Sequence, residues 1–266
     1  MKRERFLGVG VVLLVIMFLF SFSFETTAAP KGKQQYYEIK VYRVNKSTQS
    51  ERVDNYLRNS FIPALHKAGI ADVGVFKPIE SDTAYGKLIY VFIPYKSVKQ
   101  YLKLPDILNK DKQYQESSSS FVSAPYNDPP FARYESILLE AFAGMPQFVA
   151  PTFDTPAGDR IYELRSYESA TEYLASQKIK MFDEGEIALF EQLNFNPVFF
   201  AKAIAGKQMP NLMYMTSFRD MTTHDDRWKA FRAAPGWAEL SAIEEYKNTV
   251  SKSHIMLLHP TSYSDF

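Results

Sequence analysis

Two short segments of this chain carry a carboxylate, a cation and a phenol at alternate positions. The two sets, called here the polar triplets, are Glu38, Lys40 and Tyr42, and Glu163, Arg165 and Tyr167. Alternate residues of a β-strand point to the same face, so each triplet is expected to present its three polar groups together. Such a set could bind a small molecule in a cavity lined otherwise by apolar side chains. In the structural alternative, the acid and the base pair across strands and seal a domain interface.

His66 and His224 are the histidines considered for catalysis or metal binding. His66 has no second histidine or carboxylate at the spacing that a metal site needs. His224 is followed by Asp225 and Asp226, but adjacent residues on a helix do not face one centre. No metal is therefore expected. The helix dipole accounts for His66 near a helix C-terminus, and capping of the next helix accounts for His224 and its two aspartates.

Trp228 is a further candidate for ligand binding. Phe231 follows three positions later, so both rings lie on one face of an expected helix. That face could stack on a ligand. The alternative is burial against the sheet, with Trp237 closing the same cluster.

The composition argues against several common kinds of chemistry. The sequence has no Cys, Gly-rich phosphate loop, Gly-x-Ser-x-Gly elbow or His-Glu-x-x-His helix. No cofactor is expected. Acidic and basic residues balance once residues 1–29 are removed, so nucleic acid is not an expected partner. With 46% hydrophobic residues, including 21 Phe and 17 Tyr, a core can hold the fold without disulfides.

The chain repeats its first expected strand. Tyr37–Tyr42 (YEIKVY) returns about 125 positions later as Tyr162–Tyr167 (YELRSY), and similar elements follow both copies. A repeat of this length indicates a duplicated domain. Each copy shows the pattern strand, helix, strand, strand, helix, strand. The expected strands cover residues 36–44, 71–78, 87–93 and 133–142, then 160–167, 197–203, 211–219 and 253–259; the expected helices begin near 49 and 98, then cover 171–193 and 225–233.

The order βαββαβ is the ferredoxin-like plan of an α+β fold, a four-stranded antiparallel sheet with helices on one face. A tandem copy can cover the bare face, so the duplication predicts an intramolecular dimeric α/β barrel. A monomer is expected, because the partner sheet belongs to the same chain. If Tyr37, Ile39 and Val41 pack on the helices, the polar triplets lie between the two sheets.

The N-terminal residues have the features of an export signal. Lys2, Arg3 and Arg5 precede an apolar run, and small residues follow it. The expected division is residues 1–29 as a signal peptide or anchor, 35–143 as the first domain, 144–158 as a linker and 159–266 as the second domain. The protein is expected to be exported, to the periplasm or outside the cell. Membrane association is expected only if residues 1–29 are retained.

The second copy resembles the NIPSNAP family within the dimeric α/β-barrel superfamily. The segments that carry the resemblance are Arg160–Tyr167 (RIYELRSY), Asp225–Phe231 (DDRWKAF) and Pro235–Trp237 (PGW). The resemblance is good over roughly residues 159–262 and looser over 35–143, where Leu104–Asp106 stands in the place of Ala234–Gly236. It implies the barrel fold and no settled reaction. Eukaryotic members are associated with mitochondria and with partner binding.

The favoured hypothesis is binding of a small apolar or aromatic molecule or of a protein partner. The alternative rests on similarity to the wider superfamily, which includes cofactor-independent monooxygenases and haem-handling proteins. It implies proton abstraction, with His66 or His224 as base, Arg165 stabilising an oxyanion and Tyr167 as donor. This version requires a histidine beside a closed cavity. A third hypothesis is a purely structural module without a ligand-sized cavity.

Overall fold

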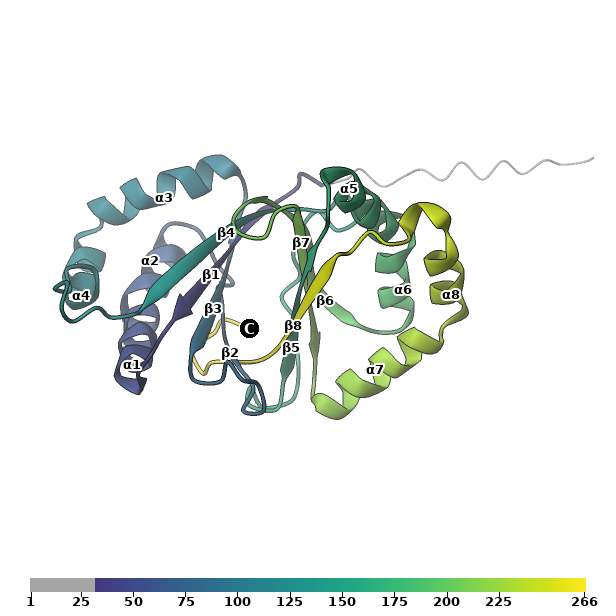
Figure 1. Ribbon diagram of the computed structural model, residues 1–266. Coiled ribbons are helices and arrows are strands. Elements are labelled where there is room, and N and C mark those ends of the chain that lie inside the picture. The colour runs from purple at the N-terminus through teal and green to yellow at the C-terminus, as the bar shows by residue number, and fades with distance from the viewer. Residues whose placement is uncertain (1–31) are drawn as a thin grey trace, which may run out of the picture. The chain divides into compact units, whose positions relative to one another are not determined.

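Eight strands close into a barrel in the computed structural model, which describes residues 32–266 (Figure 1). The strands are β1 (Tyr36–Arg43), β2 (Gly74–Pro78), β3 (Leu88–Tyr95), β4 (Arg133–Ala141), β5 (Ile161–Glu168), β6 (Asn196–Ala205), β7 (Asn211–Phe218) and β8 (Lys252–Pro260). Their order is β1-β3-β2-β8-β5-β7-β6-β4. Each half thus arranges its four strands alike, with the first strand between the fourth and the third. The predicted barrel of two tandem βαββαβ units is confirmed.

The helices of the two halves lie on opposite sides of the barrel (Figure 1). In the first half they are α1 (Ser47–Tyr56), a π-helical turn (Leu57–Phe61), α2 (Ile62–Lys67), α3 (Val98–Lys110) and α4 (Lys112–Val122). In the second half they are α5 (Glu172–Met181), a π-helical turn (Phe182–Glu186), α6 (Ile187–Gln192), α7 (Met221–Ala233), α8 (Pro235–Ala242) and a 3-10 turn (Glu244–Tyr246). Both long helices carry a π-helical turn at the same relative position, so the duplication extends to backbone detail.

The interior of the barrel is apolar, and this overturns the expected orientation of the polar triplets. Tyr37, Ile39 and Val41 point inward and pack in one core cluster with residues of the second half, such as Leu164 and Phe199. The triplets therefore face the helices and do not lie between the two sheets. The physical reason is that the two sheets enclose each other, and the closed interior accepts the side chains with the fewest groups to solvate.

The long helices and strands of the second half follow the sequence prediction closely, with one exception. Helix α7 begins at Met221, and the side chain of Asp220 caps it by accepting a hydrogen bond from Thr223 N at 2.7 Å. His224 is inside the first turn, so the expected capping role of His224, Asp225 and Asp226 is wrong. Asp220 takes that role because its short carboxylate reaches the free backbone N–H groups of the first turn.

The predicted signal or anchor at residues 1–29 lies outside the described residues. Within residues 32–266, no helix is both long and apolar enough to cross a membrane.

Candidate functional site

The polar triplet of the second half lies between its sheet and its helices and forms a continuous chain of hydrogen bonds. Arg165 donates from Nε to Glu163 Oε1 at 2.8 Å and from Nη1 to the Tyr167 hydroxyl at 3.1 Å. The Tyr167 hydroxyl lies 2.9 Å from that of Tyr214 on β7. Glu163 is 1% exposed. A buried carboxylate needs this many partners, because an unpaired charge would be costly there.

Helix α7 closes this network against solvent. Trp228 Nε1 donates a hydrogen bond to Glu163 Oε2, and the Trp228 ring stacks on the Arg165 guanidinium at 3.7 Å. His224 Nε2 lies 3.3 Å from the same carboxylate oxygen, and its Nδ1 lies 2.8 Å from Asp225 Oδ1. Trp228 is 6% exposed. Indole and imidazole therefore fill the space above the second triplet.

The acid Glu163 and the imidazole of His224 have displaced pKa values in this network. Burial disfavours the charged form of Glu163, but the neighbouring His224 imidazole and the charge of Arg165 outweigh it, so the pKa of Glu163 is lowered. Burial also disfavours the charged form of His224, but Glu163 and Asp225 outweigh it, so the pKa of His224 is raised. Both shifts favour a charged carboxylate beside a charged imidazole.

The polar triplet of the first half has different partners. Lys40 Nζ lies 3.1 Å from Glu38 Oε1 and stands 4.9 Å over the Tyr134 ring. Glu38 also accepts hydrogen bonds from the Tyr95 hydroxyl at 2.9 Å and from Ser136 Oγ at 2.6 Å. Burial and the neighbouring Glu38 carboxylate raise the pKa of Tyr95, which keeps this phenol a neutral donor.

A pocket of about 550 Å³ lies beside the first triplet, and we call it the first-half pocket. It is lined by Glu38, Lys40, Tyr56, Phe61, Tyr95, Tyr101, Leu102, Leu104, Pro105, Leu108, Asn109, Tyr114, Gln115, Val122, Tyr134 and Ser136. A second pocket of about 460 Å³ adjoins it, shares Lys40 and Tyr134, and is lined also by Tyr42, Phe121 and Phe131. The walls are thus mainly aromatic and aliphatic, and Lys40 and Glu38 supply the charges.

Helix register explains why the first half is open. α3 and α7 each have 13 residues, and the N-caps Ser97 and Asp220 define matching positions along them. Trp228 stands eight residues after its N-cap, and the residue at the same place in α3 is Pro105. Proline cannot cover Lys40 as the indole covers Arg165, so the space above the first triplet remains a pocket.

Comparison with known proteins identifies the second half. Residues 162–265 match the NIPSNAP family model. This half is a NIPSNAP domain, as the sequence resemblance predicted. No curated protein is significantly similar to the chain.

Solved structures share the fold of the two halves of this chain. A proposed monooxygenase from Lactobacillus acidophilus NCFM is 12% identical, with 86% of this chain and 94% of that chain covered and a TM-score of 0.57. An anthrone oxidase-like protein is 9% identical, with 87% and 93% covered and a TM-score of 0.52. A NIPSNAP family protein from Agrobacterium tumefaciens C58 is 17% identical, with 45% and 97% covered and a TM-score of 0.37. At such identities, the likeness to the first two shows the fold alone.

The structure separates the ligand-binding candidates into two groups. Glu38 and Lys40 line the first-half pocket, and Tyr42 lines the adjoining one. The candidates of the NIPSNAP domain, which are Glu163, Arg165, Tyr167 and Trp228, belong to the closed network and line none of the five pockets described within residues 32–266.

The two histidine candidates lie apart. The His66 side chain is 44% exposed, stands in the last turn of α2, and has Nε2 at 2.8 Å from Asp265 Oδ2. His224 is held by Glu163 and Asp225 in the NIPSNAP domain. Neither lines any of the five pockets described in residues 32–266. That part of the chain also contains no group of three or more His, Asp or Glu side chains placed to hold a metal ion.

Sequence reasoning missed most of the wall of the first-half pocket. Tyr56 and Tyr114, whose hydroxyls are 2.9 Å apart, come from α1 and α4. In sequence, Pro105 corresponds to Pro235, because Leu104–Asp106 stands in the place of Ala234–Gly236. In the structure, Pro105 lies at the helix position that Trp228 takes in the second half. A comparison of the two helices counted from their caps could have found this difference.

Proposed function

We propose that this protein is exported and binds a small apolar or aromatic molecule in the first-half pocket. The supporting observation is the cavity of about 550 Å³ at the place that Trp228 fills in the other half. Its size falls in the range of small-molecule sites, and such sites combine apolar walls with few polar groups. The proposal of export rests on the sequence of residues 1–29.

The polar groups of the pocket favour a ligand with an anionic or hydrogen-bond-accepting group. The Lys40 side chain is 18% exposed and is the cation among the lining residues. Hydrogen bonds from Tyr95 and Ser136 fix the Glu38 carboxylate in position. The ion pair between Glu38 and Lys40 then holds the Lys40 ammonium beside the pocket even when no ligand is bound. A ligand ring would pack against Tyr134, Tyr101 and the leucines of α3.

The direct test is a substitution that places a large side chain in the pocket. Pro105→Trp places the indole of the second half at the matching position of the first. We expect it to weaken binding of the anionic aromatic probe anilinonaphthalene sulfonate by about tenfold or more in a fluorescence titration, a loss of about 1.4 kcal/mol. Lys103→Trp adds the same ring to α3 at an exposed residue that does not line the pocket and should leave binding unchanged. Unchanged binding by folded Pro105→Trp, or equal losses in both variants, would refute the proposal.

The catalytic hypothesis finds no comparable support in the site. It needs a histidine beside a closed cavity, and both histidine candidates lie outside the first-half pocket. The first-half pocket also has exposed apolar residues at its rim, among them Leu102 and Val122. Such a rim could also dock a protein partner. If Lys103→Trp and Pro105→Trp both left probe binding intact, the small-molecule proposal would fail and the protein partner would be the alternative.

A further inference from the structure

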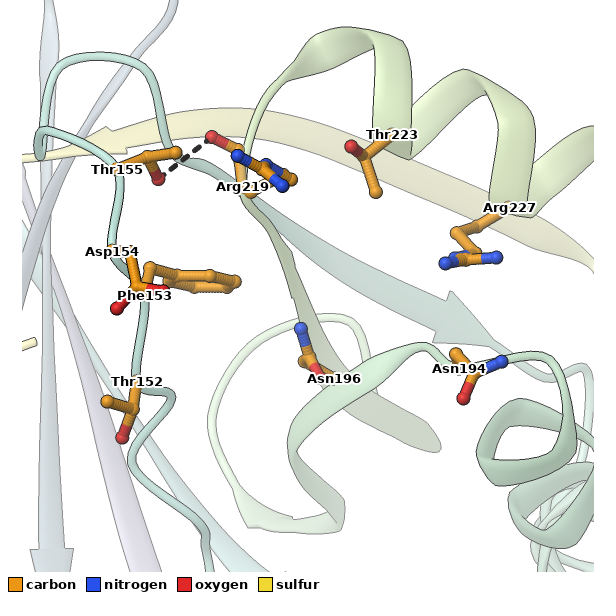
Figure 2. A pocket seen from close by; sticks show the side chains of 9 residues that line it. All are labelled: Thr152, Phe153, Asp154, Thr155, Asn194, Asn196, Arg219, Thr223 and Arg227. Atoms are coloured by element: carbon orange, nitrogen blue, oxygen red, sulfur yellow. Dashed lines mark hydrogen bonds between the residues drawn. The ribbon is translucent and has the colours of Figure 1, made fainter.

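A third pocket, of about 320 Å³, lies in the other half of the molecule and is lined by no residue of either polar triplet (Figure 2). The linker before β5, the turn between α6 and β6, the end of β7 and the first turns of α7 surround it. It is lined by Thr152, Phe153, Asp154, Thr155, Asn194, Asn196, Arg219, Thr223 and Arg227. Its polar, cationic lining differs from the aromatic lining of the first-half pocket.

The two arginines of this pocket are poorly neutralised by the protein. Arg227 has no ion pair within residues 32–266, and its Nε is buried there without a hydrogen-bond partner. Arg219 Nε lies 3.6 Å from Asp220 Oδ2, and its side chain is 62% exposed. A buried donor without an acceptor is costly, and an oxyanion beside Arg227 would supply the acceptor.

Neutral donors stand opposite the arginines. Figure 2 shows the Arg227 side chain extending from α7 over Asn194, with Asn196 and the ring of Phe153 farther across the pocket on the linker side. The side-chain amides of Asn194 and Asn196 make no hydrogen bond with the described residues. The hydroxyl of Ser217 does donate to Asn196, but to its backbone carbonyl. Thr155 Oγ1 donates to the Arg219 carbonyl at 3.2 Å and ties the linker to the end of β7. The two arginines and the two asparagine amides therefore border one pocket that is open to solvent.

We propose that this pocket binds a small oxyanion, either a carboxylate or a phosphate, through Arg227 and Arg219, with the Asn194 and Asn196 amides as further donors. Phe153 gives the site an apolar wall that suits an attached ring. Asp154 also lines the pocket and opposes an anion, so the site favours a low charge. This inference is independent of the first-half pocket.

The test follows the Arg227 Nε–Hε resonance by NMR in the intact folded chain. We titrate inorganic phosphate in one arm and benzoate in the other, which separates the two oxyanion classes. A saturable shift with either ion supports the site. Absence of saturation with both would overturn it.

Matched variants establish that the binding is local. The affinities of the variants are measured by isothermal titration calorimetry, because Arg227→Gln lacks the resonance that is followed in the wild type. Arg227→Gln should weaken binding of the ion by about tenfold, because it removes charge-assisted hydrogen bonds. Arg232→Gln removes the same charge from an exposed position of the same helix and should change affinity less than about twofold, because exposed charges are screened. Asp154→Asn should tighten binding. Equal effects of the two arginine variants would overturn the proposal. Arg219→Gln provides a second test if Arg227→Gln does not fold.

Discussion

The two halves of the barrel carry the same kind of polar triplet on the helix-facing side of their first strands but surround it differently. In the NIPSNAP domain, Trp228 and His224 cover Glu163 and Arg165 and leave them buried. In the first half, Pro105 and Tyr101 occupy the matching helix positions, and Glu38 and Lys40 line a pocket. The comparison shows that one duplicated plan can stabilise the fold in one half and keep a cavity in the other.

The comparison predicts unequal stability losses when each glutamate is removed. Glu163→Ala leaves Arg165 buried without its carboxylate, so we expect a loss of about 3–5 kcal/mol in the free energy of unfolding. Glu38→Ala leaves Lys40 beside a pocket that admits water, so a loss of about 1–2 kcal/mol is expected. Urea denaturation monitored by circular dichroism measures both. Equal losses would show that the two triplets have the same role.

Opening the closed half should make it resemble the open one. Trp228→Ala removes a buried ring and a hydrogen bond to Glu163, and we expect a loss of about 3 kcal/mol. The variant should also gain a second site for anilinonaphthalene sulfonate, which a fluorescence titration at fixed saturating protein would detect as increased stoichiometry. Unchanged stoichiometry in the folded variant would mean that Trp228 alone does not close the second half.

The closed half should contribute to the pH dependence of stability through His224 and Glu163. The raised pKa of His224 means that its contribution is complete below its ordinary value of 6.5 and is lost as pH rises through the higher folded value. The lowered pKa of Glu163 means that its contribution is present above its ordinary value of 4.5 and is lost as pH falls through the lower folded value. Thermal denaturation across this range, with His224→Gln as control, measures the effect. The decrease on the alkaline side should disappear in that variant.

The sequence was sufficient for the architecture and insufficient for the contents of the site. Alternation located β1 and β5 and their polar faces, and the repeat predicted the closed barrel. Alternation could not decide which face pointed inward, because both faces of these strands are buried, one by the other sheet and one by helices. The pocket depends on contacts that α1 makes with α3 and α4, and both of these helices are distant from α1 in sequence.

Some buried polar groups also gave no sequence signal. Lys178 lies on α5 with Nζ at 2.6 Å from Glu186 Oε2, and both side chains are almost fully buried. Charged residues at helical positions usually face solvent, so the sequence gives no sign of this pair. Lys178 Nζ also lies over the Trp237 ring, so this pair helps to fill the space between sheet and helices in the NIPSNAP domain, where the first half has a pocket.

In the proposed function, the first half binds a ligand at the place that Trp228 occupies in the second half. The most direct measurement is native mass spectrometry of the wild-type chain and of Pro105→Trp, each purified gently from the cells that produce it and then denatured to release bound molecules. We expect the wild-type protein to release a small molecule that is absent from Pro105→Trp. Wild-type protein without a bound molecule, or the same molecule at the same occupancy in both proteins, would contradict it.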